Sequence, residues 1–118
     1  MGSSFKELIV WQRAVELSLA VYRFTASFPA SEQFGLTSQM RRAAVSVASN
    51  IAEGYGKASK GEYVQFLGHA RGSLCELETQ AVIARSLKLG NAAQSEIVEG
   101  LSDEVGRMIS AILAKLKR

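Results

Sequence analysis

The chain reads KGEYVQFLGHARGSLCELETQAVIARSLKL from Lys60 to Leu89, and this stretch decides the fold. Apolar and aromatic residues recur there at alternating steps of four and three, at Tyr63, Leu67, Ala70, Leu74, Leu77, Ala81 and Ala84. Such steps place side chains on one face of an α-helix, as in the seam of a coiled coil. Ser59 and Glu62 form a capping box before it. The pattern predicts a helix over residues 60–89 that buries one face against other helices.

Three further segments have helical spacing, and no segment shows the sustained alternation of a β-strand. They span residues 5–28, 37–53 and 92–116. Proline disfavours helix in the residue before it, so Pro29 should end the first segment. We expect Thr37 to cap the second helix and Gly54 to end it in the left-handed conformation. Gly90 should end the third helix, and Asn91 should cap the last.

Four helices with short connections predict an all-α fold, an antiparallel up-down-up-down four-helix bundle. A chain of 118 residues has the length of one domain, and 47% apolar residues can supply its core. In this topology the connection between the second and third helices lies at the same end as both termini. No apolar run reaches the length of a membrane span, and no signal segment opens the chain, so we expect a cytoplasmic protein.

Helix 5–28 carries two apolar stripes, whereas a helix in a monomeric bundle usually needs one. The first stripe is Leu8, Trp11, Val15, Leu19 and Tyr22, and the second is Val10, Ala14, Leu17, Val21, Phe24 and Phe28. One bundle core cannot cover both stripes. We therefore expect the chain to self-associate.

A stripe of small residues follows the third helix at Gly68, Gly72, Cys75 and Thr79. Glycine inside a helix costs about 1 kcal/mol relative to alanine. Two such glycines one turn apart predict close packing against the small residues Ala44, Ala48 and Ala52 of helix 37–53. On this interpretation Gly72→Leu destabilises the fold by more than about 2 kcal/mol. Cys75, the single cysteine, is expected to be a buried filler.

No group of residues indicates catalysis, a cofactor or a metal site. His69 is the only histidine, and Cys75 lies six residues further on, on a different helix face. Glu76 and Glu78 also point to different faces, and we interpret them as salt-bridge partners of Arg42 or Arg71. The glycine-rich segment 54–61 lacks the spacing of a P-loop and follows a helix. We therefore expect no enzymatic activity.

The net charge of +3 comes from one part of the chain. Residues 36–74 hold five basic residues against two acidic ones, and the remaining residues balance at nine against nine. The C-terminal cations should lie at the same end of the bundle as residues 54–61. A basic surface of this kind can bind phosphates, although ordinary solvated charge explains it equally well. The candidate nucleic-acid-binding residues are Arg41, Arg42, Lys57, Lys60, Arg71, Lys115, Lys117 and Arg118.

Two features near these cations allow alternative interpretations. Tyr55 could stack on single-stranded nucleic acid, or it could pack its ring over the end of the bundle. Arg42, Ser46, Asn50 and Glu53 share one helix face. A buried polar network or a contact between subunits explains that face as well as nucleic-acid binding does.

Three motifs resemble those of a known family. They are LTSQMRRAAVS at residues 36–46, NIAEG at 50–54 and GSLCELET at 72–79. The chain resembles the bacterial four-helix bundle family, also called the 23S ribosomal RNA intervening-sequence protein family. That family often has proline where this chain has Ala48, which implies a less kinked second helix here. No activity is firmly established for the family.

A related branch of the family is the accessory variability protein of diversity-generating retroelements, a basic pentameric barrel. That protein associates with a reverse transcriptase and nucleic acid. The resemblance therefore implies a homo-oligomer, a pentamer, with RNA or DNA and a reverse transcriptase or other protein as partners. Our first hypothesis is a non-enzymatic, homo-oligomeric adaptor associated with nucleic acid. The alternative is a structural or protein–protein interaction bundle that does not bind nucleic acid.

Overall fold

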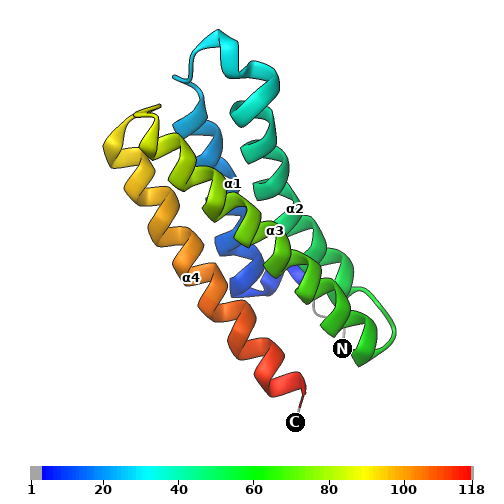
Figure 1. Cartoon of the computed structure of the whole chain (residues 1–118). Coiled ribbons are helices and arrows are strands. Elements are labelled where there is room, and N and C mark those ends of the chain that lie inside the picture. Colours follow the sequence, from blue (N-terminus) through cyan, green and yellow to red (C-terminus); the bar gives the residue numbers. More distant parts are fainter. Residues whose placement is uncertain (1–3, 118) are drawn as a thin grey trace.

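The computed structural model describes residues 4–117, and four long helices form an antiparallel bundle in it (Figure 1). The long helices are α1 (Ile9–Thr25), α2 (Ser38–Tyr55), α3 (Lys60–Ser86) and α4 (Ala92–Leu116). Each helix packs against the next one in the chain, and α4 returns to pack against α1. The described part of the chain contains no strand, which confirms the all-α bundle. None of its helices combines the length and hydropathy needed to cross a membrane.

The α2–α3 connection lies at the same end of the bundle as both ends of the chain (Figure 1). The α1–α2 and α3–α4 connections lie at the opposite end. This arrangement confirms the predicted up-down-up-down order. The bundle measures 45 by 20 by 20 Å.

The predicted stripes of α3 and α1 form much of the core. Leu67, Ala70 and Leu77 of α3 are fully buried. The second stripe of α1 is buried as well, from Val10 to Phe28. The first stripe faces outward: its members near the N-terminal end are half-buried, whereas Leu19 and Tyr22 are 48% and 44% exposed. One bundle core therefore covers only one of the two stripes.

The two ends of α1 and the start of α2 differ from the prediction. Ser4 caps a separate 3-10 turn, Phe5–Glu7, so α1 begins only at Ile9. At its other end α1 stops at Thr25, before Phe28. Thr37 makes no capping bond, because a short helical segment, Gln33–Thr37, which is kinked at Gly35, leads directly into α2. A 3-10 turn, Ala30–Glu32, precedes that segment.

The predictions for α3 were partly right. Its N-terminal capping box forms, since the Ser59 hydroxyl accepts a hydrogen bond from the Glu62 N–H at 3.1 Å. At the other end α3 stops at Ser86, and Lys88 takes the left-handed conformation with a φ of 60°. Gly90 also has a positive φ, but it lies beyond the helix end that we expected it to form.

The start of α4 agrees with the prediction. The Asn91 side chain accepts a hydrogen bond from the Gln94 N–H at 3.1 Å, as a cap does. The helix then runs over the predicted residues, 92–116. In α2 the backbone continues without interruption through Ala48, the position where the family often has proline.

The predicted role of the α3 glycines was wrong. A Cβ added to Gly68 or Gly72 would meet no atom within 4 Å, and both Gly72 and Cys75 are exposed. The close approach between α2 and α3 occurs at Gly54, which is buried inside α2 and does not end it. A Cβ there would lie 2.6 Å from the Cβ of Phe66. Glycine is therefore needed at position 54, where the two helices meet.

We predict opposite effects on stability for two glycine-to-alanine variants. Gly54→Ala should lower the free energy of unfolding by at least about 1 kcal/mol, because the new methyl group overpacks the contact with Phe66. Gly72→Ala should raise it by about 0.5–1 kcal/mol, because alanine restricts the unfolded chain and meets open space in the helix. Urea denaturation measures both values. Equal effects at the two positions would contradict this assignment of the close contact.

Candidate functional site

Four of the candidate lysines lie at the end of the bundle that holds the α2–α3 connection and both chain ends (Figure 1). Lys57 lies in the connection and Lys60 begins α3, while Lys115 lies in the last turn of α4 and Lys117 follows it. Within residues 4–117 none of these lysines forms an ion pair. We call this group the lysine end. Arg118, the fifth cation predicted here, lies outside the described residues.

Aromatic rings accompany the lysine end. The Lys57 ammonium lies 5.2 Å from the centroid of the half-buried Phe66 ring, and Phe66 packs edge-on against the exposed His69. Tyr55 packs edge-on against Tyr63, with ring centroids 5.8 Å apart. Burial, and then the neighbouring Tyr55, raise the pKa of Tyr63. Tyr55 therefore packs over the bundle end, which was the second of its two interpretations.

The three arginine candidates lie away from the lysine end. Arg41 and Arg42 lie in the first turns of α2, about 20 Å along the helix from its last residue, Tyr55. Arg71 is exposed near the middle of α3. The structure therefore does not bring the eight predicted cations together in one surface.

Arg41 and Arg42 flank a groove between α1 and α2. The Arg41 Nε donates to the Thr25 hydroxyl at 2.9 Å, and its guanidinium carbon lies 4.4 Å from the centroid of the Tyr22 ring. Arg42 is exposed and has no ion-pair partner among the described residues. The groove is lined by Tyr22, Arg41, Arg42, Val45 and Ser46, and we call it the arginine groove.

The polar face of α2 joins that helix to α3. The Ser46 and Ser73 hydroxyl oxygens lie 2.9 Å apart, and the Asn50 Nδ2 donates to the Ser46 carbonyl at 2.8 Å. This network supports the structural interpretation of Ser46 and Asn50, which sequence analysis had left open. Arg42 and Glu53 remain exposed on the same face.

The predicted salt bridges from Glu76 and Glu78 to Arg42 or Arg71 do not form. Glu78 instead lines a groove between α3 and α4 that also contains Asp103. Burial, and then the charge of Asp103, raise the pKa of Glu78. Beside these carboxylates, the Arg85 Nη1 lies 3.2 Å from Glu99 Oε2. We call this surface the carboxylate groove; Ala81, Val82, Ser95 and Ser102 complete its lining.

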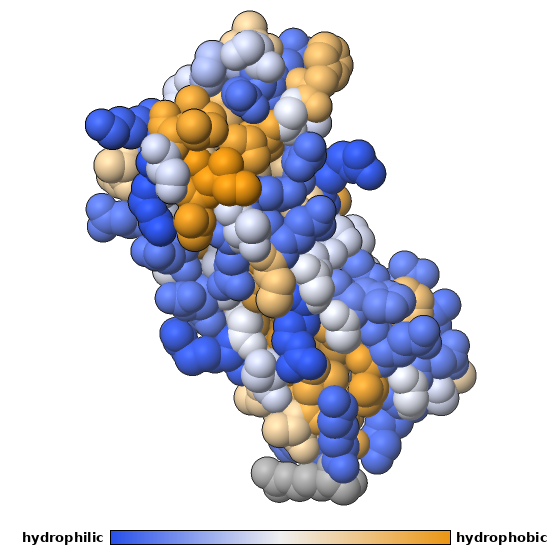
Figure 2. All heavy atoms as spheres, in the orientation of Figure 1, coloured by the Kyte–Doolittle hydropathy of each residue, from blue (hydrophilic) through white to orange (hydrophobic). Residues whose placement is uncertain are grey.

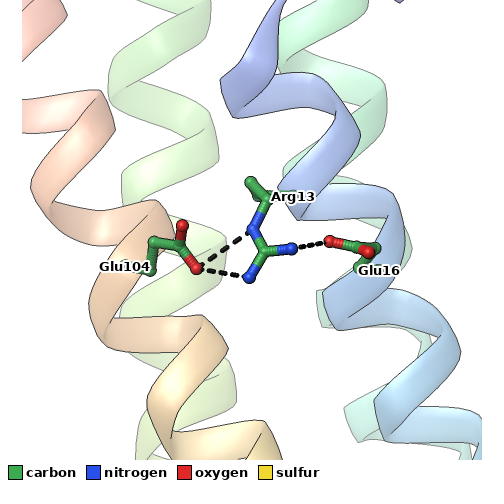
Figure 3. A network of polar contacts seen from close by, with 3 residues as sticks. All are labelled: Arg13, Glu16 and Glu104. Atoms are coloured by element: carbon green, nitrogen blue, oxygen red, sulfur yellow. Dashed lines mark hydrogen bonds and ion pairs between the residues drawn. The ribbon is translucent and has the colours of Figure 1, made fainter.

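Sequence analysis missed a charged network between α1 and α4, because its members lie far apart in the chain (Figure 3). The Arg13 guanidinium donates to one carboxylate oxygen of Glu104 through Nε at 3.0 Å and through Nη2 at 2.7 Å. A second ion pair joins Arg13 to Glu16. The hydrogen bond that Arg13 donates to Glu104 is the main cause that raises the pKa of Arg13. The groove beside this network exposes Leu19 and Ile97.

The described residues contain no cluster of three or more His, Cys, Asp or Glu side chains that could hold a metal ion. The polar grooves lie on separate sides of the bundle, and each is open at the surface.

Comparison with solved structures supports this architecture. The chain is similar to a protein of unknown function from the S23 ribosomal protein family of Bacteroides thetaiotaomicron. The TM-score is 0.79 at 19% sequence identity, and the match covers 89% of this chain and 98% of the other. At that identity the likeness shows the fold alone. No curated protein matches the chain.

The family comparison covers most of the sequence. Residues 6–111 match the family described as 23S rRNA-intervening sequence protein. The match includes the three motifs at residues 36–46, 50–54 and 72–79. The chain therefore belongs to the 23S rRNA-intervening sequence protein family.

Proposed function

We propose that this protein is a non-enzymatic, homo-oligomeric adaptor that associates with RNA or DNA through its lysine end. The observation that carries the proposal is that four lysines without ion-pair partners lie at one end of the bundle, where Lys57 lies over the Phe66 ring. Lysines at helix ends contact phosphates, and the half-buried Phe66 ring and the exposed His69 ring add a surface on which bases can stack. These contacts carry little sequence information, so binding should be broad.

Assembly strengthens this proposal, because each copy contributes its own lysines. The resemblance to pentameric relatives suggests five copies around an axis, and a reverse transcriptase or another protein is a further candidate partner. Repeated lysine ends would displace many condensed counterions from one nucleic acid, and affinity would then fall steeply with salt. A single lysine end binds more weakly, since Glu53 and Glu62 lie at the same end and offset part of its charge.

The same two glutamates favour the alternative function, a structural or protein-interaction bundle. If they cancel the field of Lys57 and Lys60, the lysine end is ordinary solvated surface. The assembly surfaces would then be the functional feature of the molecule. Binding to nucleic acid distinguishes the two proposals.

We predict that replacing Lys57 and Lys60 with glutamate weakens binding to RNA and single-stranded DNA across unrelated sequences. Each substitution replaces attraction to a phosphate with repulsion, so the loss should be largest at low salt. Fluorescence anisotropy over a salt series measures it. The control variant replaces two exposed cations at the other end of the bundle, Arg23 and Lys88, with glutamate. Wild-type protein that fails to bind at low salt, or a lysine variant that binds like the control, would favour the structural alternative.

We also predict that the wild-type protein is an oligomer at micromolar concentration. The reason is the outward stripe of α1, where Leu19 and Tyr22 remain about half exposed: Leu19 lies beside Ile97 of α4, and Tyr22 faces the groove toward α2. Multi-angle light scattering should give a mass that is a multiple of the 12.7 kDa chain. A stable monomer at this concentration would contradict the oligomeric part of the proposal.

A further inference from the structure

The arginine groove carries positive charge and apolar surface together. Both of its cations, Arg41 and Arg42, lack an acidic partner among residues 4–117, and no acidic side chain lines the groove. Tyr22 and Val45 expose 44% and 43% of their surface beside the two guanidinium groups. The Tyr22 ring and Thr25 hold Arg41 in place, so the groove presents an ordered positive surface.

The carboxylate groove has the complementary character. Arg85 is paired with Glu99, which leaves the charges of Glu78 and Asp103 without a cation within ion-pair distance in the described chain. Burial, and then the charge of Asp103, raise the pKa of Glu78 in this groove. Apolar residues gather over the same end of the bundle in Figure 2, and the exposed ones in this part of α3 are Val82, Ile83 and Leu87.

The two grooves lie on opposite sides of the bundle. Because the helices pack in the order α1, α2, α3, α4 and back to α1, the α1–α2 groove faces away from the α3–α4 groove. Their charged residues also lie at similar heights along the bundle axis. Tyr22 is in the last turn of α1 and Arg41 in the first turn of α2, while Glu78 lies in the last third of α3 and Asp103 in the first half of α4. Tyr22 and Arg41 therefore lie near the end opposite the lysines, whereas Asp103 lies close to the middle of α4. Arg42 shares a groove with Glu76 of α3, which places the arginines at about the height of Glu78.

We propose that the arginine groove of one copy docks against the carboxylate groove of a second copy of this chain. The apolar residues of both grooves supply contact area, and the opposite charges fix the partner and its register. A side of the bundle measures 45 by 20 Å, which is enough for the ~800 Å² that each partner buries in a stable interface. This docking rests on the proposed self-association and specifies its geometry.

The docking is head-to-tail, because each copy uses a different groove toward each of its two neighbours. Grooves at similar heights place neighbouring bundles side by side, with their lysine ends on the same side of the assembly. Such contacts close into a ring when the rotation between copies allows it. The lysine ends then form one annulus, whereas the arginines are covered along the sides.

Charge reversal tests the docking directly. Arg42→Glu and Asp103→Arg should each weaken self-association by roughly tenfold or more, because each places like charges face to face. The double variant, Arg42→Glu with Asp103→Arg, restores opposite charges at every contact and should recover the wild-type mass. Arg71→Glu is the matched control, since Arg71 is exposed and lines neither groove. Sedimentation equilibrium gives the association constants, and circular dichroism checks that each variant is folded.

The outcomes separate this docking from self-association in general. Loss of assembly in both single variants, with recovery in the double variant, supports the docking. If wild type assembles and the single variants assemble as tightly as Arg71→Glu, the copies associate through another surface and the docking is wrong. If the double variant stays folded but dissociated, the two residues do not face each other and the docking is also wrong. A monomeric wild type overturns both the docking and the proposed self-association.

Discussion

The short connections between the helices constrain every other feature of the molecule. Four residues, 56–59, join α2 to α3, and five, 87–91, join α3 to α4. A connection of that length cannot span α3, whose 27 residues extend for about 40 Å. For this reason α3 must run antiparallel to both α2 and α4. This constraint places the lysines at one end and the arginine groove near the other end.

Sequence periodicity predicted most of the fold, because burial follows the turns of a helix. The α3 stripe around Leu67 and Leu77 faces the core, and the Ser59 cap forms as predicted. The glycines could not be assigned in the same way, since a glycine looks alike in sequence whether it faces a neighbour or solvent. Gly54 carried the usual sign of a helix end, yet its small size serves a contact with Phe66, and Gly72 is exposed.

The candidate site was predictable only where topology determines it. The placement of Lys57 and Lys115 at one end follows from the antiparallel order alone. Counting charge along the chain wrongly grouped Arg42 with these lysines, because residues close in a helical sequence can lie about 20 Å apart along its axis. The grooves were beyond sequence reasoning for a different reason. Pairs such as Glu78 with Asp103 come together only when two helices pack side by side.

Separation of the charged surfaces allows assembly and nucleic-acid binding to coexist. If copies associate through their sides, the arginine groove of each copy meets the carboxylate groove of its neighbour and both charges are neutralised locally. This pairing covers charges on the sides of the bundle but leaves the net charge at +3 per chain. The positive charge that still faces solvent therefore lies mainly at the bundle ends. There the lysines of neighbouring copies come together without competing for the same contacts. Side-by-side assembly would thus turn a weak lysine end, partly offset by Glu53 and Glu62, into a continuous positive surface.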